Sequence, residues 1–340
     1  PASDKVPSFA NGELSIHFLE LGNKYAGDSI YIKSGDTDIL IDAGSRDSSA
    51  STIVSYLDQY VEDGKLEYVI ATHSDQDHIA AFVGNSSNEG ILSYYDVDMI
   101  IDFPLTNKTG SKETQVLRNY YALRDQKVES GTIHYTALEC YNEENGAQRT
   151  YQLSEGVELE ILYNYYYENK SSDENNYSVC VMINQGDNHY LFTGDLEEEG
   201  EEQLVDYYNG IGNPLPQCVL FKAGHHGSPT SSTTKLLEVI RPQYVVVCCC
   251  AGSPEYSDNL PNQFPSQDFI DRIAPYTDKV YVTTIIETVS GSSWTHQLMN
   301  GNIVFNIRKS NIEVICSNSD KILKEWDWFK ENRTCPAAWK

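Results

Sequence analysis

Three apolar segments of this sequence each run directly into a group of histidine and aspartate residues. The first segment, residues 68–71, is followed by THSDQDH, which places His73, Asp75, Asp77 and His78 within six positions. A short apolar run of this kind predicts a buried strand, and the loop after such a strand lies at one end of its sheet. The pattern therefore favours a fold in which polar loops from several strands meet at a sheet edge.

Two later segments repeat this arrangement. The run 189–193 leads into TGD, which ends at Asp195, and the run 218–223 leads into GHHGS, which contains His225 and His226. Four of the eight histidines of the chain lie in two of these loops. Imidazole nitrogens and carboxylate oxygens are common ligands of divalent metals, so the sequence predicts a metal site. A polar, solvated loop is the alternative interpretation.

The order of the predicted elements indicates an α/β protein in which two sheets face each other with helices outside. Strands are expected at 14–20, 29–33, 38–42, 68–72, 98–103, 177–184, 189–193, 218–223, 244–250, 279–284, 303–308 and 312–316. Helices are expected at 51–60, 113–126, 233–240 and 267–273, short strands and turns at 132–162, and an irregular loop at 163–176. We expect the aromatic tail, 320–340, to pack on this body as a helix.

The chain is strongly acidic. Its 50 acidic and 24 basic residues give a formal net charge of −26 at pH 7. Such a field repels phosphate backbones unless metals or a local basic patch reverse it, so binding of extended nucleic acid is disfavoured. A solvated surface is the simplest explanation of the acidity.

No stretch approaches the roughly 20 consecutive apolar residues that a membrane span requires, so we expect a soluble globular chain without a membrane span. The compartment stays open, because a chain that begins at Pro1 is consistent with the cytoplasm or with export after removal of an N-terminal segment. The eight cysteines contain no CxxC pair, and Cys316 and Cys335 are expected to pair only in an exported protein. The oligomeric state is also open.

Four motifs occur in an order that is typical of a known family. They are LIDAG, THSDQDH, TGD and GHHGS, at residues 40–44, 72–78, 193–195 and 224–228. With them, the chain resembles the metallo-β-lactamase superfamily over about residues 14–308, and it is most similar to the ComEC-type domains of DNA-uptake proteins and to the phosphorylcholine esterase domain. Asp75 stands where the usual HxHxDH motif has its middle histidine, as in ComEC-type members, and the turn containing Asp28 is also similar to theirs.

The resemblance implies an αββα sandwich with a dinuclear site for two divalent ions, zinc or manganese. The oxygen-rich ligand set favours manganese. The implied ligands are His73 and Asp75 for the first ion, Asp77 and His78 for the second, Asp195 as a bridge, and His226 to complete the set. The implied catalytic residues are Asp77 and His225, the latter as a proton donor that faces the substrate. The residues expected to orient ligands or to face the substrate are Asp28, Asp42, Asn175 and Ser228.

Two positions depart from the superfamily pattern. The stretch 173–181, DENNYSVCV, has asparagines and a serine where many members have a histidine, and this supports the ComEC-type subgroup. Phe264-Pro265 stands where ComEC-type domains have His-Pro, which puts one ligand or substrate contact in doubt. His296 is a hypothetical substitute, and a solvated loop histidine is the alternative interpretation.

The resemblance implies a hydrolase domain at 14–317, with an extension at 1–13 and a helical tail at 318–340. We expect a metal-activated hydroxide to attack a phosphodiester or a related small phosphoester. One alternative is a carboxylic ester, thioester or lactone hydrolase on the same metals, and another is a non-catalytic binding module that keeps the fold. The tyrosines at 163 and 165–167 form a hypothetical aromatic cage for a choline-type cation, with surface or core packing as the alternative.

Overall fold

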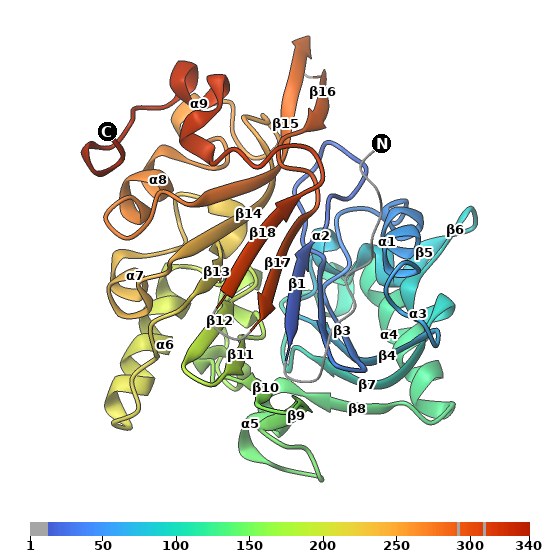
Figure 1. Cartoon of the computed structure of the whole chain (residues 1–340). Helices are drawn as coiled ribbons and strands as arrows, with labels where there is room; N and C mark the ends of the chain where they lie inside the picture. The colour runs from blue at the N-terminus through green and yellow to red at the C-terminus, as the bar shows by residue number, and fades with distance from the viewer. Residues whose placement is uncertain (1–12, 291–292, 309–310) are drawn as a thin grey trace.

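Two eight-stranded sheets pack face to face in the structure, a computed structural model that describes residues 13–290, 293–308 and 311–340 (Figure 1). The order of the first sheet is β18-β17-β1-β2-β3-β4-β7-β8, and that of the second is β16-β15-β14-β13-β12-β11-β10-β9. Helices α1 to α4 lie on one side of the sandwich and α6 to α9 on the other (Figure 1). The predicted α/β fold with an αββα arrangement is thus confirmed.

The first sheet is covered by the N-terminal helices. Its strands are β1 (Leu14–Phe18), β2 (Ile30–Ser34), β3 (Thr37–Ile41), β4 (Lys65–Ala71), β7 (Asp96–Asp102), β8 (Ile133–Thr136), β17 (Ile303–Arg308) and β18 (Asn311–Cys316). The helices are α1 (Ser49–Leu57), α2 (Gln76–Val83), α3 (Ile91–Tyr94) and α4 (Gln115–Glu129), and a small hairpin of β5 (Gly84–Asn85) and β6 (Asn88–Glu89) follows α2. Strands β3, β4, β7 and β8 run parallel to one another.

The second sheet is built from the later part of the chain. Its strands are β9 (Thr150–Ser154), β10 (Val157–Ile161), β11 (Val181–Gln185), β12 (Asn188–Phe192), β13 (Leu220–Lys222), β14 (Tyr244–Ala251), β15 (Val280–Ser290) and β16 (Ser293–Leu298). The helices are α5 (Ala137–Asn142), α6 (Glu198–Gly210), α7 (Thr234–Ile240), α8 (Gln267–Ile273) and α9 (Asp327–Asn332). Strands β12 to β15 are parallel. None of these described helices is long and apolar enough to cross a membrane.

Aromatic side chains from both sheets form the core between them. Phe18 of β1 lies 6.3 Å from Phe192 of β12, measured between ring centroids, and Phe305 of β17 lies 5.4 Å from Tyr244 of β14. Burial of such rings removes large apolar areas from water, which is the main stabilising contribution to a sandwich of this kind. This packing holds the two sheets against each other.

Several local elements differ from the sequence-based expectations. Helix α1 begins at Ser49 and ends at Leu57, two to three residues earlier than predicted at each end. Helix α5 was not expected within 132–162, although its capping box, Thr136 with Glu139, can be found in the sequence. Strand β15 continues to Ser290 and pairs with β16, so the strand predicted at 279–284 is only its first half. All eight cysteines lie within the described residues and are free.

The C-terminal segment packs against the outer side of the second sheet. Phe329 and Trp339 are buried there and contact each other, with ring centroids 5.6 Å apart. Arg333 donates hydrogen bonds to the carbonyl oxygens of Pro265 at 3.1 Å and Gln263 at 2.7 Å. This segment thereby fixes the loop that precedes α8.

We expect Arg333→Ala to lower the free energy of unfolding by about 2–3 kcal/mol, because two buried carbonyl groups lose a charged donor. Urea unfolding followed by circular dichroism measures this loss. Lys330→Ala is the matched control, since Lys330 pairs with Asp327 on the exposed face of α9 and its loss costs less than about 1 kcal/mol. Equal losses for both variants would contradict the role given to the Arg333 contacts.

Candidate metal centre

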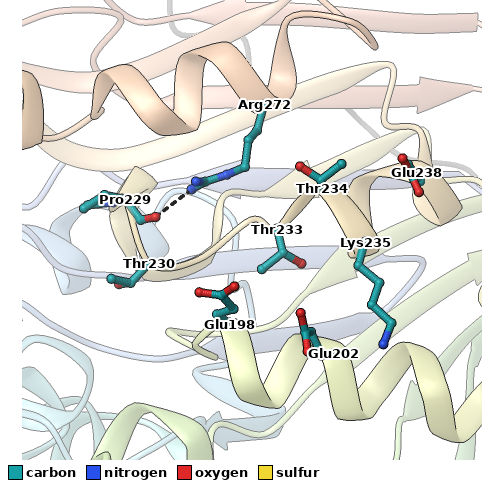
Figure 2. Close-up of a pocket in the computed structure, with 9 residues that line it drawn as sticks. All are labelled: Glu198, Glu202, Pro229, Thr230, Thr233, Thr234, Lys235, Glu238 and Arg272. Carbon is teal, nitrogen blue, oxygen red and sulfur yellow. Dashed lines mark hydrogen bonds between the residues drawn. The ribbon is translucent and has the colours of Figure 1, made fainter.

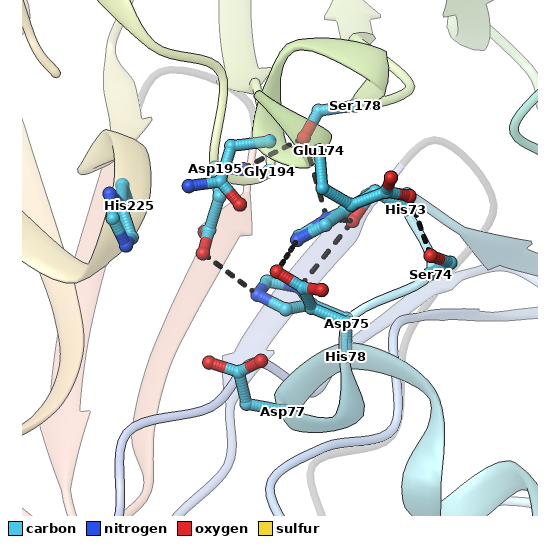
Figure 3. A network of polar contacts seen from close by, with 12 residues as sticks. His73, Ser74, Asp75, Asp77, His78, Glu174, Ser178, Gly194, Asp195 and His225 are labelled. Atoms are coloured by element: carbon cyan, nitrogen blue, oxygen red, sulfur yellow. Dashed lines mark hydrogen bonds and ion pairs between the residues drawn. The ribbon is translucent and has the colours of Figure 1, made fainter. Parts of the chain in front are cut away.

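Four of the predicted ligands meet at the ends of the parallel strands. Asp77, His78, Asp195 and His226 present nitrogen or oxygen atoms that all lie within 4.8 Å of one another. Asp195 Oδ2 is 3.1 Å from Nε2 of both His78 and His226, and His226 Nε2 is 3.4 Å from Asp77 Oδ2. We call these four residues the inner tetrad; three of them are labelled in Figure 3.

The backbone around the tetrad explains how loops this short deliver the side chains. Asp77 and His78 lie in the first turn of α2, directly after β4. His225 and His226 both have positive φ, 41° and 53°, and Asp42 at the end of β3 has φ of 59°. Non-glycine residues in this region are strained and persist only where the surroundings hold them, which is common at functional sites.

Two carboxylates behind the tetrad orient its imidazoles. Asp42 Oδ2 accepts hydrogen bonds from His78 Nδ1 at 2.7 Å and from Thr72 Oγ1 at 2.7 Å. Asp28 Oδ1 lies 3.3 Å from His226 Nδ1. Both rings therefore turn their Nε2 atoms toward Asp195. This is the arrangement by which carboxylates typically orient metal-binding histidines.

The tetrad fits a divalent metal ion. The buried Nε2 atoms of His73, His78 and His226 make no well-formed hydrogen bond among the described residues, although carboxylate oxygens of Asp75 and Asp195 lie 3.1–3.6 Å away. A buried nitrogen without a hydrogen bond is costly in free energy. A cation bound between the four tetrad side chains would satisfy the Nε2 atoms of His78 and His226 at once. Two imidazole nitrogens and two carboxylates are a donor set that suits zinc or manganese.

The electrostatics of the site also favour a cation. Burial alone would raise the pKa values of Asp77 and Asp195, but the neighbouring imidazoles of His78 and His226 outweigh it and hold both pKa values below the usual range. Burial alone would lower the pKa values of those two imidazoles, but Asp195 outweighs burial, and both pKa values lie well above the usual value for histidine. The carboxylates are therefore ionised, and the imidazoles bind protons that a metal ion would replace.

Lys222 is a site residue that the motifs did not reveal. Its side chain is fully buried, and its ammonium pairs with Asp28, with Asp195 Oδ1 at 3.3 Å and with the carbonyl oxygen of Gly194 at 2.9 Å. Burial alone would lower the pKa of Lys222, but the two carboxylates raise it by more, so the pKa lies above its usual value. A single lysine inside the apolar run 218–223 was the available signal.

His73 and Asp75, the pair of ligands predicted for the first ion, lie beside the tetrad and outside it. The His73 ring is 4.1 Å from the His78 ring, and His73 Nε2 is 3.6 Å from Asp75 Oδ2. Asp75 also pairs with the ammonium of Lys108 (Figure 3 shows the His73–Asp75 contact). We call His73 and Asp75 the outer pair. Burial raises the pKa of Asp75, but His73 and Lys108 lower it to about 2.

His225 lies outside the tetrad and contacts Glu197. Its Nδ1 lies 2.7 Å from Glu197 Oε1, and Asn175 Nδ2 donates to the same oxygen at 2.9 Å. Burial lowers the pKa of His225, whereas Glu197 raises it, with a net rise. Asn175 therefore acts on His225 through Glu197, which is a contact that sequence analysis missed.

The loop that carries both histidines is held from behind by α8. Arg272 donates to the carbonyl oxygens of Pro229, Ser231 and Ser232 at 2.9, 2.8 and 3.0 Å (Figure 2 shows the first contact). Ser228 bonds Thr230 within this loop, so it lies behind the site and supports the loop. The pocket beside Arg272, of about 490 Å³, is lined by residues of this loop, α6, α7 and α8 and by none of the tetrad.

Comparison with known proteins agrees with this geometry. A family model of the metallo-beta-lactamase superfamily matches residues 22–88 and 173–251, which contain the whole tetrad. The predicted resemblance to the metallo-β-lactamase superfamily is confirmed. Competence protein ComA of Neisseria gonorrhoeae is 28% identical over 65% of this chain and 25% of its own length. ComE operon protein 3 of Bacillus subtilis is 22% identical over 54% of this chain and 20% of its own length.

The chain thus spans a quarter or less of the length of these two relatives. Among solved structures, the metallo-beta-lactamase fold protein YhfI from Bacillus subtilis is similar, with a TM-score of 0.44 and 11% identity, over 84% of this chain and all of that one.

Phe264, at the position where the family resemblance implies a histidine, forms an aromatic wall beside the tetrad. Its ring stacks on Tyr256 at 4.9 Å and lies 6.5 Å from the His226 ring. Tyr256 in turn donates a hydrogen bond from its hydroxyl to Asp77 Oδ2 at 2.8 Å. His296 lies on β16 opposite Ile286 and belongs to no group of candidate ligands among the described residues, so the hypothesis that it serves as a substitute ligand gains no support.

The four tyrosines at 163 and 165–167 do not surround a common space. Tyr167 is buried in the core, Tyr163 stacks on Tyr207 at 4.1 Å, and Tyr166 donates to Glu199. Only Tyr165 of the four is strongly exposed. These tyrosines therefore serve packing, and the hypothesis of an aromatic cage is not supported.

We expect Lys222→Met to destabilise the metal-free protein by about 3–5 kcal/mol, because the unbranched methionine leaves Asp28 and Asp195 buried without their cation. Urea unfolding in the presence of a chelator measures this. Lys235→Met is the control: Lys235 pairs with Asp206 at 2.6 Å on the surface, and we expect a loss below about 1 kcal/mol. A loss for Lys222→Met no larger than that of the control would show that the buried ammonium is not needed.

Proposed function

We propose that the protein is a metal-dependent hydrolase that cleaves a phosphodiester or a related phosphoester. The observation that carries this proposal is the inner tetrad, in which two buried imidazole nitrogens and two carboxylates converge on one point without well-formed hydrogen bonds for the nitrogens. Members of the matched superfamily are mostly metal-dependent hydrolases, and the described ligand set fits that chemistry. A non-catalytic module would not require strained histidines at the ends of the strands.

Zinc or manganese would be held by the four residues of the tetrad. A bound divalent ion would lower the pKa of a water molecule toward about 7 and so supply a nucleophile at neutral pH. His225, oriented by Glu197, would donate a proton to the leaving group. Asp77, which accepts a hydrogen bond from Tyr256, is the other residue to which we give a catalytic role. Asp28 and Asp42 would fix the imidazole rings.

The substrate would be small. A formal charge of −26 opposes the approach of long polyanions, because their many phosphates are repelled while only a few contact the site. Phe264 and Tyr256 would offer an aromatic surface to the group bound beside the tetrad. A carboxylic ester, thioester or lactone would react at the same site by the same chemistry, so an assay must separate these classes.

We expect the purified, metal-loaded protein to hydrolyse bis-p-nitrophenyl phosphate or phosphorylcholine esters faster than a lactone and ester panel. Asp195→Ala should abolish this activity and the bound metal together, with the fold retained in circular dichroism. Asp206→Ala, on the exposed face of α6, is the control and should keep both. Preferential hydrolysis of lactones would show that the substrate class is a lactone and not a phosphoester. Activity without bound metal in Asp195→Ala would refute the proposed metal centre.

The adjacent histidines should separate into two roles. We expect His225→Ala to lower kcat about 10²-fold or more while the metal content stays near that of the parent, because a proton donor is lost. His226→Ala should lower the metal content first, because a ligand is lost. Metal analysis by atomic emission together with steady-state kinetics measures both effects, and the reverse pattern would exchange the two assignments.

A further inference from the structure

The inner tetrad has four closely spaced ligand residues, whereas the outer pair has two. This difference bears on how many ions the centre holds. From this difference we infer that the protein binds a single divalent ion, at the inner tetrad, and that the ammonium of Lys108 takes the position of a second cation beside Asp75. The inference rests on the proposed metal-dependent hydrolase function. It revises the expectation of two ions that the family resemblance implies.

The first argument is the number of ligands. Protein metal sites of this class have three or four protein ligands. Among the described residues, every group of three or more closely spaced ligand residues excludes both His73 and Asp75. The neighbouring Ser178 hydroxyl lies 3.4 Å from His73 Nδ1 and accepts a hydrogen bond from the backbone N–H of Asp195 at 3.1 Å. Ser178 therefore supports His73 from behind and does not complete a second site.

The second argument concerns Asp195, which would have to bridge two ions. Its Oδ2 lies 3.1 Å from the imidazoles of His78 and His226, within the tetrad. Its Oδ1 lies 3.3 Å from the buried ammonium of Lys222. Each oxygen of the Asp195 carboxylate therefore already has a charged partner. A second divalent ion at Oδ1 would have to approach the buried Lys222 ammonium, which is unfavourable at low dielectric.

The third argument is that Lys108 is held in place. Glu174 accepts hydrogen bonds from Ser74 Oγ at 2.5 Å, from Thr106 Oγ1 at 2.7 Å and from the Asn107 backbone N–H at 2.6 Å. Glu174 thus joins the segment before Lys108 to the loop after β4, which contains Ser74 (Figure 3 shows Glu174 beside Ser74). The Lys108 ammonium then contacts the Asp75 carboxylate and donates to the Ser74 carbonyl at 3.0 Å. An ammonium fixed on Asp75 competes directly with a metal ion for that carboxylate.

The arrangement also limits the substrate. An ammonium has three N–H groups, and Asp75 and Ser74 account for two of them, while 21% of the Lys108 side chain remains exposed. The third N–H can donate to an anionic oxygen of a substrate that reaches Asp75. One divalent ion plus one ammonium suits the single negative charge of a phosphodiester.

Metal counting tests this inference independently of catalysis. Metal-stripped protein is dialysed against Mn²⁺ alone, and the bound manganese is measured by atomic emission and by electron paramagnetic resonance. We expect one ion per chain, with the spectrum of an isolated Mn²⁺, in the parent protein. Lys108→Ala and Lys108→Gln should each show additional, weaker Mn²⁺ binding beside His73 and Asp75, because the Asp75 carboxylate is released from the ammonium. Lys112→Ala, an exposed lysine in the same segment, should stay at one ion.

Three results would overturn the inference, and they are distinguishable. Two ions of similar affinity in the parent protein would refute the single-ion centre while leaving the hydrolase proposal intact. One ion in both Lys108 variants, with unchanged thermal unfolding, would refute the role of Lys108. No bound ion in the parent protein would refute this inference and the proposed function together.

Discussion

The concentration of buried charge at the ends of the parallel strands is the constraint on which the rest of the structure depends. Asp28, Asp42 and Asp195 are all nearly inaccessible, and Asp77 is only slightly more exposed. Carboxylates this close together cannot all remain ionised in a buried site unless cations compensate them. Lys222 provides one fixed cation, and protonated imidazoles or a divalent ion must provide the remainder. Folding and metal binding are therefore expected to be coupled.

The sandwich makes this concentration of charge geometrically feasible. Parallel strands in both sheets end at the same edge, so the loops after β3, β4, β12 and β13 need to be only a few residues long. Short loops force unusual backbone conformations, and each strained residue costs of the order of 1–3 kcal/mol. Packing behind the loops offsets this cost, as the hydrogen bonds of Arg272 to the loop after β13 illustrate.

The sequence predicted which side chains meet at the candidate metal centre better than it predicted the residues that support them. His78, Asp195 and His226 lie in short motifs whose spacing follows from strand ends, and the α/β sandwich follows from the order of the apolar runs. Lys222, Glu197 and Lys108 have no such motif, because their roles depend on partners that are 22 to 194 positions away or on a neighbouring loop. Helix α5 is a different case, since its capping box was present in the sequence but was outweighed by the surrounding short strand patterns.

The overall acidity and the local charges act on different parts of the reaction. A field from −26 charges concentrates divalent cations near the protein, but it also opposes an anionic ester. At physiological ionic strength charges are screened over about 8 Å, so an ester that reaches the tetrad responds mainly to nearby groups. Those groups include Lys108, which pairs with Asp75, and Lys222, which lies 3.3 Å from Asp195. A short substrate can benefit from these few cations, whereas a long polyanion must also cross the acidic surface, and this difference favours a small phosphoester.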